Sequence, residues 1–218
     1  MKLTKRTTLT SAFLVALVSI ALPAYAQHAD HEVKTTPNAS KAAQTGAALR
    51  DLWVGHVFWV RNVAVDTLAG NSAAATAAEN EVVANAKQIA AAIEPYYGKP
   101  ASEKLFGLLA AHYGAVKQYL EATAAGSKTK QDAATKALTA NAGEIATFLS
   151  GANPYLPFDT LNGLLLAHGG HHIQQIQQLK AKQYAEEAQT WEAMKQHMYV
   201  IADALAGAIA KQFPDKFN

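Results

Sequence analysis

The chain has 218 residues, of which half are hydrophobic and 17% are charged, with 13 Gly, 7 Pro and no Cys. This composition excludes a disordered or collagen-like chain. The absence of cysteine excludes disulfides, thiolate metal sites, iron–sulfur clusters and covalently attached c-type haem. The formal net charge is +2, but Lys2, Lys5 and Arg6 lie in an expected leader, and without them 16 Lys and Arg stand against 17 Asp and Glu. We therefore expect no nucleic-acid partner, because no excess of basic residues remains to neutralise phosphates.

Residues 1–26 have the pattern of a signal peptide. A basic start is followed by an apolar run over 12–22 and then by Ala24 and Ala26, the small residues that signal peptidase accepts. The apolar run is shorter than the roughly 20 residues that a membrane-spanning helix needs. We therefore expect cleavage near Ala26, no stable membrane insertion of the mature chain, and a periplasmic or secreted protein.

Residues 27–45 are polar and lack helical periodicity, which predicts a flexible arm. His28 and His31 lie in this arm, close to the N-terminus that cleavage would create. They can hold a divalent ion loosely or remain solvated, and a solvated arm is the simpler interpretation.

From residue 46 to the C-terminus, apolar residues recur at helical spacing. The periodicity predicts six helices, at 46–69, 73–94, 101–124, 129–150, 158–182 and 186–212. Gly, Asn, Ser and Pro mark the breaks between them, and Ser72 and Asp159 are expected N-caps. No window alternates with period two. The sequence therefore predicts an all-α domain over 46–218, an antiparallel helical bundle.

An internal repeat is visible when the chain is compared with itself at a shift of 56 residues. Segment 84–90 aligns with 140–146, and segment 105–114 aligns without a gap with 161–170. This register predicts that the second and third helices recur as the fourth and fifth. Gly114 and Gly170 lack side chains, and we expect them to let the third and fifth helices approach each other closely.

Four of the predicted helices carry a histidine in the apolar stripe near the helix midpoint: His56, His112, His168 and His197. At about 1.5 Å of rise per residue, all four lie within about 3 Å of mid-height, so they can share one layer. Facing helices of bundles build metal sites from inward-pointing side chains, and neutral imidazole is the commonest metal ligand. The sequence therefore predicts a transition-metal site, for Zn, Cu, Ni or Fe.

Three further residues belong to this hypothesis. Asn85 and Asn141 lie near the midpoints of the second and fourth helices, where they can orient the imidazoles. His172 follows His168 by four residues on the same helix face and is a possible extra ligand. Four histidines without an open coordination position favour metal binding, for sequestration or delivery, over hydrolysis, and so do not point to an enzyme.

Two alternatives remain open at the level of sequence. A layer of His and Asn can satisfy its own hydrogen bonds and fix the register of a structural or partner-binding bundle that holds no metal. A weaker alternative is an enzyme or a bundle that binds haem noncovalently, with His197, Met194 or Met198 as an axial ligand.

Three motifs resemble those of a family of small bacterial helical-bundle proteins. They are L-W-x-x-H-x-x-W-x-R at 52–61, P-Y-Y-G at 95–98 and Q-F-P-x-K-F at 212–217. The resemblance covers nearly the whole predicted domain and implies a helical bundle. The family positions that it implies are His56, Arg61, His112, Asn141, His168 and His197. The chain departs from the family at 169–172, Gly-Gly-His-His, where it is richer in histidine.

Overall fold

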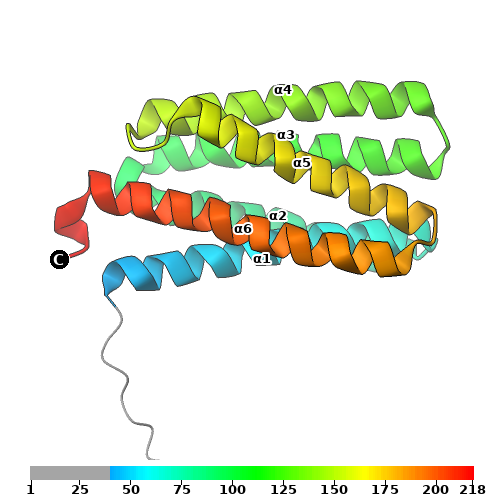
Figure 1. The fold of residues 1–218 in the computed structure, drawn as a ribbon, viewed down its shortest axis with the longest axis horizontal. Helices are drawn as coiled ribbons and strands as arrows, with labels where there is room; N and C mark the ends of the chain where they lie inside the picture. Colours follow the sequence, from blue (N-terminus) through cyan, green and yellow to red (C-terminus); the bar gives the residue numbers. More distant parts are fainter. Residues whose placement is uncertain (1–39) are drawn as a thin grey trace, which may run out of the picture. The chain divides into compact units, whose positions relative to one another are not determined.

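A computed structural model describes residues 40–218, which form six α-helices and one 3-10 turn (Figure 1). The elements are α1 (Lys41–Leu68), α2 (Ser72–Tyr97), α3 (Lys99–Ala124), α4 (Lys128–Ala152), α5 (Phe158–Lys180), α6 (Tyr184–Gln212) and η1 (Pro214–Lys216). The described residues contain no strand, so the predicted all-α antiparallel bundle is confirmed. The leader expected at 1–26 and most of the arm expected at 27–45 lie outside the described residues. Within residues 40–218, no helix combines the length and the apolar character needed to cross a membrane.

Most helix boundaries lie within about two residues of the predicted ones, and the two that lie further away differ for identifiable reasons. Helix α1 begins at Lys41 rather than 46, because the Ser40 hydroxyl accepts a hydrogen bond from the Ala43 amide and caps the helix. Helix α2 continues through Pro95 and ends before Gly98, whose φ of 80° favours glycine. Proline alone did not end this helix.

The two expected N-caps are replaced by their neighbours in the chain. Asn71 caps α2, since its Oδ1 accepts a hydrogen bond from the Ala74 amide, and Ser72 is the first helical residue. Helix α5 begins at Phe158 after Pro157, which places Asp159 in the first turn. A carboxylate there still interacts favourably with the positive end of the helix dipole.

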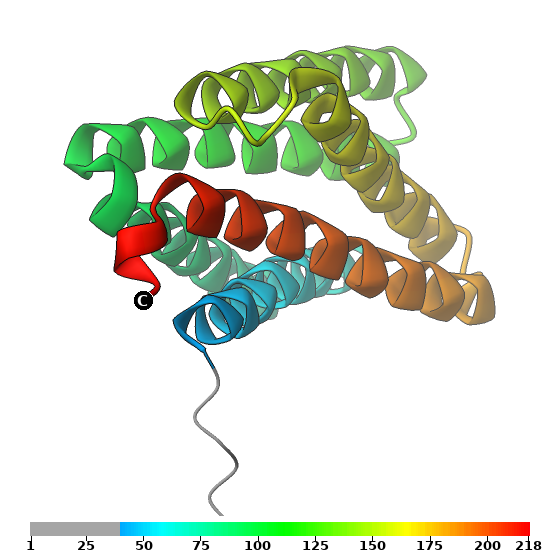
Figure 2. The ribbon, with the colours of Figure 1, turned by 60° about the vertical axis from the view of Figure 1, so that its left-hand side comes forward.

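The six helices form a closed ring, in which each helix contacts the next and α6 contacts α1 (Figures 1 and 2). The odd-numbered helices α1, α3 and α5 also contact one another across the interior. Because neighbouring helices are antiparallel, these three run in the same direction. Residues at equal depth on the three helices therefore lie in one layer, and those whose side chains point inward can meet at its centre.

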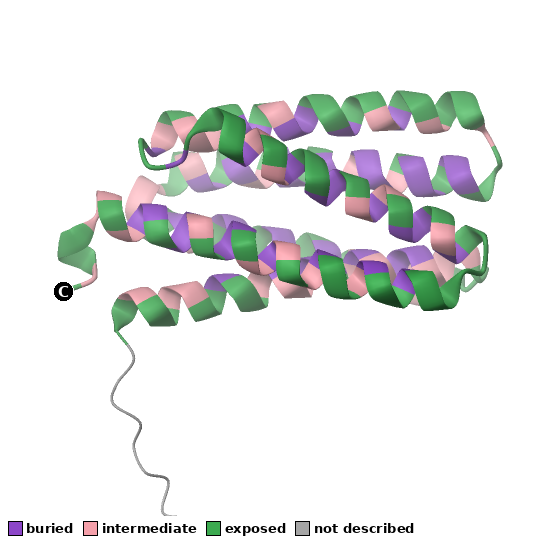
Figure 3. Ribbon diagram, in the orientation of Figure 1, coloured by how far each residue is buried: buried purple, intermediate pink, exposed green. Residues whose placement is uncertain are grey.

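The core consists of two apolar clusters that follow each other along the bundle. Figure 3 shows buried residues, in purple, along the lengths of the helices. The larger cluster includes Trp53, Leu108 and Leu165. The smaller one includes Val60 and Ile176. On α3 and α5 the larger cluster precedes the buried histidines and the smaller cluster follows them. On α1 the larger cluster extends to Val57, next to His56, and the smaller one begins at Val60. The histidines therefore lie where the two clusters meet.

The close helix approach expected at Gly114 and Gly170 is not present at either residue. A Cβ atom added at Gly114 or Gly170 would have no neighbour within 4 Å, whereas one added at Gly169 would lie 3.0 Å from Cδ2 of Leu138. Gly169 therefore allows α5 to approach α4, and the expectation was wrong because the glycine that makes contact is one residue earlier. The helix packing by itself does not show the predicted two-helix repeat.

Candidate metal centre

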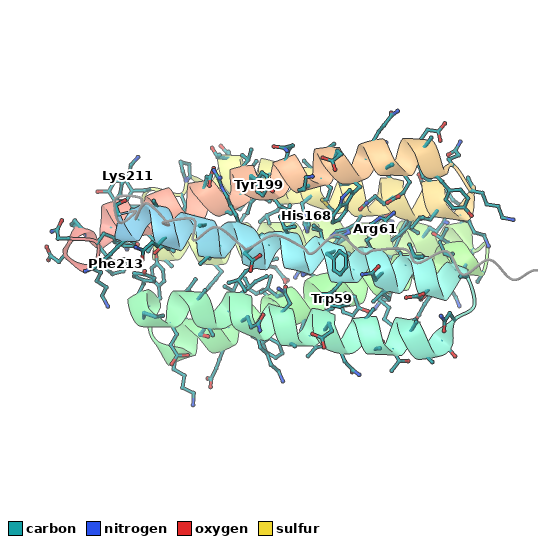
Figure 4. The ribbon with its side chains drawn as sticks, turned by 90° about the horizontal axis from the view of Figure 1, so that it is seen from below. Trp59, Arg61, His168, Tyr199, Lys211 and Phe213 are labelled. Atoms are coloured by element: carbon teal, nitrogen blue, oxygen red, sulfur yellow. The ribbon has the colours of Figure 1, made fainter. Side chains whose placement is uncertain are left out.

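Four histidines from three helices meet in the middle of the bundle. His56 comes from α1, His112 from α3, and His168 and His172 from α5; Figure 4 labels His168 halfway along the helices. Each offers one ring nitrogen, and these nitrogens all lie within 4.8 Å of one another. The four side chains are only 1–2% exposed. They form one compact, dry group of nitrogen donors, which we call the histidine cluster.

The spacing of the rings is close to that of imidazoles around a single ion. Four imidazoles bound tetrahedrally at about 2.0–2.1 Å have nitrogens roughly 3.3 Å apart and ring centroids roughly 5 Å apart. In the cluster, the centroid separations run from 4.5 to 6.4 Å. The Nε2 atoms of His168 and His172 are 3.2 Å apart. Ring shifts of about an ångström would therefore bring all four nitrogens to one metal ion.

Burial keeps the cluster in the neutral form that binds metals. Loss of hydration, followed by the neighbouring charge of His112, lowers the pKa of His56 to about 3. Loss of hydration also lowers the pKa of His112 to about 4, although its contact with Asn141 opposes this shift. The pKa values of His168 and His172 fall well below the ordinary value, through burial first and then through the nearby imidazoles. At neutral pH all four rings therefore carry a free lone pair.

Asn141 determines which nitrogen of His112 faces the cluster. The Asn141 Nδ2 group donates to the Leu108 carbonyl oxygen at 3.1 Å, and its Oδ1 lies 3.2 Å from Nδ1 of His112. A carbonyl can only accept, so the amide NH₂ must face Leu108 and the amide oxygen must face His112. Nδ1 of His112 therefore carries the proton, and Nε2 keeps its lone pair for a metal.

Asn85 and His197 make the same kind of backbone contact without reaching a cluster ring. Asn85 donates from Nδ2 to the Leu52 carbonyl at 3.0 Å, and His197 donates from Nε2 to the Leu164 carbonyl at 2.8 Å. The structure does not bring His197 into the cluster, where His172 provides the fourth nitrogen. Depth along α6 had suggested His197 as a ligand, but depth does not fix the direction in which a side chain points.

Three nitrogens of the cluster have no hydrogen-bond partner: His56 Nδ1, His112 Nε2 and His168 Nδ1. A buried polar atom without a partner costs about 1–3 kcal/mol. A histidine layer built only to fix the helix register would be expected to satisfy these atoms. Of these three atoms, His112 Nε2 is the one whose lone pair the contact with Asn141 leaves available at the centre of the core.

A second buried polar group lies next to the cluster, and the sequence analysis missed most of it. Glu187 of α6 is 1% exposed and accepts from Nε and Nη2 of Arg61, each at 2.6 Å, and from Nε2 of Gln175 at 3.0 Å. The bond to Glu187 raises the pKa of Arg61. Arg61 follows His56 by five residues and Gln175 follows His172 by three, a spacing that places both one turn beyond the cluster. We call this group the Arg61–Glu187–Gln175 network; Figure 4 labels Arg61 on α1.

No protein-family model, curated protein or solved structure matches this chain. The fold and the site by themselves define a helical bundle with a buried four-histidine cluster that can hold a metal ion.

Proposed function

We propose that this protein binds one transition-metal ion through His56, His112, His168 and His172. The observation that carries this proposal is the convergence of four neutral, buried ring nitrogens within 4.8 Å of one another. Imidazole nitrogen suits Zn²⁺, copper, Ni²⁺ and iron, so the donor set leaves the metal open among these. The ligand set differs from the predicted one in a single residue, His172 in place of His197.

The role that fits this site is metal sequestration. Four protein ligands complete a tetrahedral shell, whereas a catalytic zinc keeps a position for water. The signal-peptide pattern at 1–26 supports a periplasmic or secreted location, and the motifs at 52–61, 95–98 and 212–217 support membership of the bacterial helical-bundle family that they resemble. We propose this location and this family on the sequence alone.

Two features argue against the alternatives. The buried Nε2 of His112, which has no hydrogen-bond partner, speaks against a purely structural layer. Haem bound between two of the cluster histidines needs space for a macrocycle around the iron. Every pair of cluster rings has the other two within 6.4 Å, and these would occupy that space.

Metal analysis of the mature chain, purified without an affinity tag, tests the proposal. We expect one equivalent of a transition metal, either as purified or after titration of the chelator-treated protein with Zn²⁺ or Co²⁺. Replacing His112 and His168 together by Gln should abolish binding. A variant with His28 and His31 replaced by Gln should keep the equivalent, which separates the cluster from the N-terminal arm.

His171→Gln is the matched control, because His171 belongs to the same helix and lies outside the cluster. Circular dichroism of every variant checks that the bundle has folded. Less than a tenth of an equivalent in the folded wild-type protein, with no uptake on titration, would overturn the proposal.

A further inference from the structure

Three side chains reach the backbone of the neighbouring helix in the same way. The hydrogen bonds run from Asn85 to the Leu52 carbonyl, from Asn141 to the Leu108 carbonyl and from His197 to the Leu164 carbonyl. Each bond joins residues 33 apart in the chain. The three acceptors are spaced 56 residues apart, and a cluster histidine follows each of them by four residues. The pattern therefore occurs once in each of the hairpins α1–α2, α3–α4 and α5–α6.

The same interval also relates the histidines of the cluster. His56, His112 and His168 are successive members of a series spaced by 56 residues, one on each odd-numbered helix. Asn85, Asn141 and His197 form the matching series on the even-numbered helices. His197 thus occupies the place that asparagine has in the other two hairpins.

We propose that Asn85, Asn141 and His197 are equivalent positioning residues for the metal site. Each one donates to a leucine carbonyl and accepts from the Nδ1–H group of a cluster histidine. His56, His112 and His168 then all present Nε2 to the ion. The inference rests on the proposed function for the identity of the ligand, although the hydrogen bonds themselves form without a metal.

The middle hairpin already has the complete arrangement, from Leu108 through Asn141 to His112. In the first hairpin, Oδ1 of Asn85 and Nδ1 of His56 are both buried and unpartnered. A side-chain rotation that pairs them would satisfy two polar atoms at once. Gly55 provides space for the Asn85 amide, because a Cβ at this position would lie 3.2 Å from Nδ2.

Histidine can replace asparagine in the third hairpin because it also carries one donor and one acceptor on a flat group. The Leu164 carbonyl can only accept, so Nε2 of His197 holds the proton and Nδ1 keeps a lone pair. The buried Nδ1 of His168 has no partner and is the matching donor. This pairing fixes the tautomer of His168 as Asn141 fixes that of His112.

The test begins with ¹⁵N-histidine NMR of the metal-free wild-type protein, in which the tautomer of each ring is read directly. We expect Nδ1–H for His56, His112 and His168. Replacing His197 by Ala should leave His168 as a mixture of tautomers and weaken Zn²⁺ binding by about 10- to 100-fold, as the loss of such supporting contacts does in other metal sites. His197→Asn, which copies the other two hairpins, should restore both the tautomer and the affinity.

The outcomes separate this inference from the proposed function. An Nε2–H tautomer at His168 in the metal-free protein, or equal weakening by His197→Asn and His197→Ala, overturns the positioning role and leaves the metal site standing. Nδ1–H at all three rings without any binding of Zn²⁺ or Co²⁺ overturns the metal site and supports the positioning role. The wild-type spectra need no variant, so a poorly folding variant does not block the test.

Discussion

His172 reaches the histidine cluster differently from the other three ligands. It follows His168 by one helical turn on α5, and at the 56-residue interval its counterparts on α1 and α3 are Val60 and Val116. The other three histidines are counterparts of one another. In the proposed metal site, His172 therefore supplies the fourth ligand from a position that is apolar elsewhere in the bundle.

Replacing His172 by Val tests its part in the shell. We expect the variant to keep one equivalent of Co²⁺ with weaker affinity, because three histidines remain, and to gain an open coordination position. Azide should then change the visible spectrum of the Co²⁺-loaded variant and leave that of the wild-type protein unchanged. His171→Val serves as the control. A His172→Val protein whose Co²⁺ spectrum and affinity match the wild type would show that His172 is not a ligand.

The metal-free protein should lose stability as the pH falls from about 6.5 to 4. Burial lowers the pKa of His56 to about 3 and that of His112 to about 4, and lowers those of His168 and His172 as well. The unfolded chain takes up protons near pH 6.5 and the folded chain does not, so acid favours unfolding. Each histidine costs up to about 1.4 kcal/mol per pH unit across this range.

Urea unfolding between pH 8 and 4.5 measures this loss. A total of a few kcal/mol per pH unit is a large share of the roughly 5–15 kcal/mol that stabilises a typical domain. His172→Val removes one titrating group, so its free energy of unfolding should fall less steeply below pH 6. A free energy of unfolding that stays flat between pH 6.5 and 4.5 contradicts the lowered pKa values.

The sequence predicted three of the four clustered histidines and gave His197 as the fourth, with His172 only as a possible extra ligand. Depth along the helices was sufficient for His56, His112 and His168, because α1, α3 and α5 are parallel and face one point. Depth could not separate His172 from His197, since it carries no information on the direction of a side chain around the helix. The 56-residue interval does indicate the direction of the His197 side chain. At this interval, the counterpart of His197 is Asn141, and not the cluster ligand His112.

At the scale of the helices, the Arg61–Glu187–Gln175 network joins α1, α5 and α6 at one buried carboxylate. Replacing Arg61 by Met leaves the charge of Glu187 buried without its partner, and we expect a loss of about 3–5 kcal/mol. Replacing both Arg61 and Glu187 by Met should recover most of this loss, since an apolar pair of similar volume avoids the burial of charge. Urea unfolding of the two variants checks this. Equal destabilisation in both would show that the ion pair itself, rather than the unpaired carboxylate, sets the cost.

The contact between α4 and α5 depends on one of two adjacent glycines. Gly169→Ala would place a Cβ 3.0 Å from Leu138, and we expect overpacking to cost about 1–3 kcal/mol. Gly170→Ala meets no neighbour within 4 Å, so it should stabilise α5 by up to about 1 kcal/mol through its higher helix propensity. Thermal unfolding of the two single variants gives the comparison. If Gly169→Ala and Gly170→Ala changed the stability in the same direction, the close approach at Gly169 would be ruled out.

The helices themselves were predictable because apolar spacing repeats over many turns, while their ends depend on single contacts. Pro95 suggested a stop, yet α2 continues to Tyr97, since a proline in the last turn leaves only one hydrogen bond unmade. Glu187 was not expected in the core, because an acidic residue in the first turn of a helix usually faces solvent. Its burial depends on Arg61, which is 126 residues away in the chain.

At the scale of the whole molecule, the closed ring of helices surrounds the cluster on every side. The four ligand side chains are 1–2% exposed, and α6 contacts α1 to complete the ring. A chelator cannot reach an ion held there while the helices stay packed. The rate of metal removal by EDTA should therefore be independent of EDTA concentration and should rise with urea at concentrations below the unfolding midpoint. A removal rate proportional to EDTA concentration would contradict this enclosure.

The enclosure of the cluster also affects which metal ion the proposed site would hold. His56 and His172 lie 116 positions apart in the chain, so the complete donor set exists only after α1, α3 and α5 have come together. An ion captured at that moment is then retained for as long as the ring stays closed. Copper outcompetes the other divalent ions at equilibrium. Exchange of the bound ion for copper would nevertheless be limited by the rate at which the helix ring opens. Under the proposed function, the metal content of the protein would therefore record which ions were available in the compartment where the chain folded.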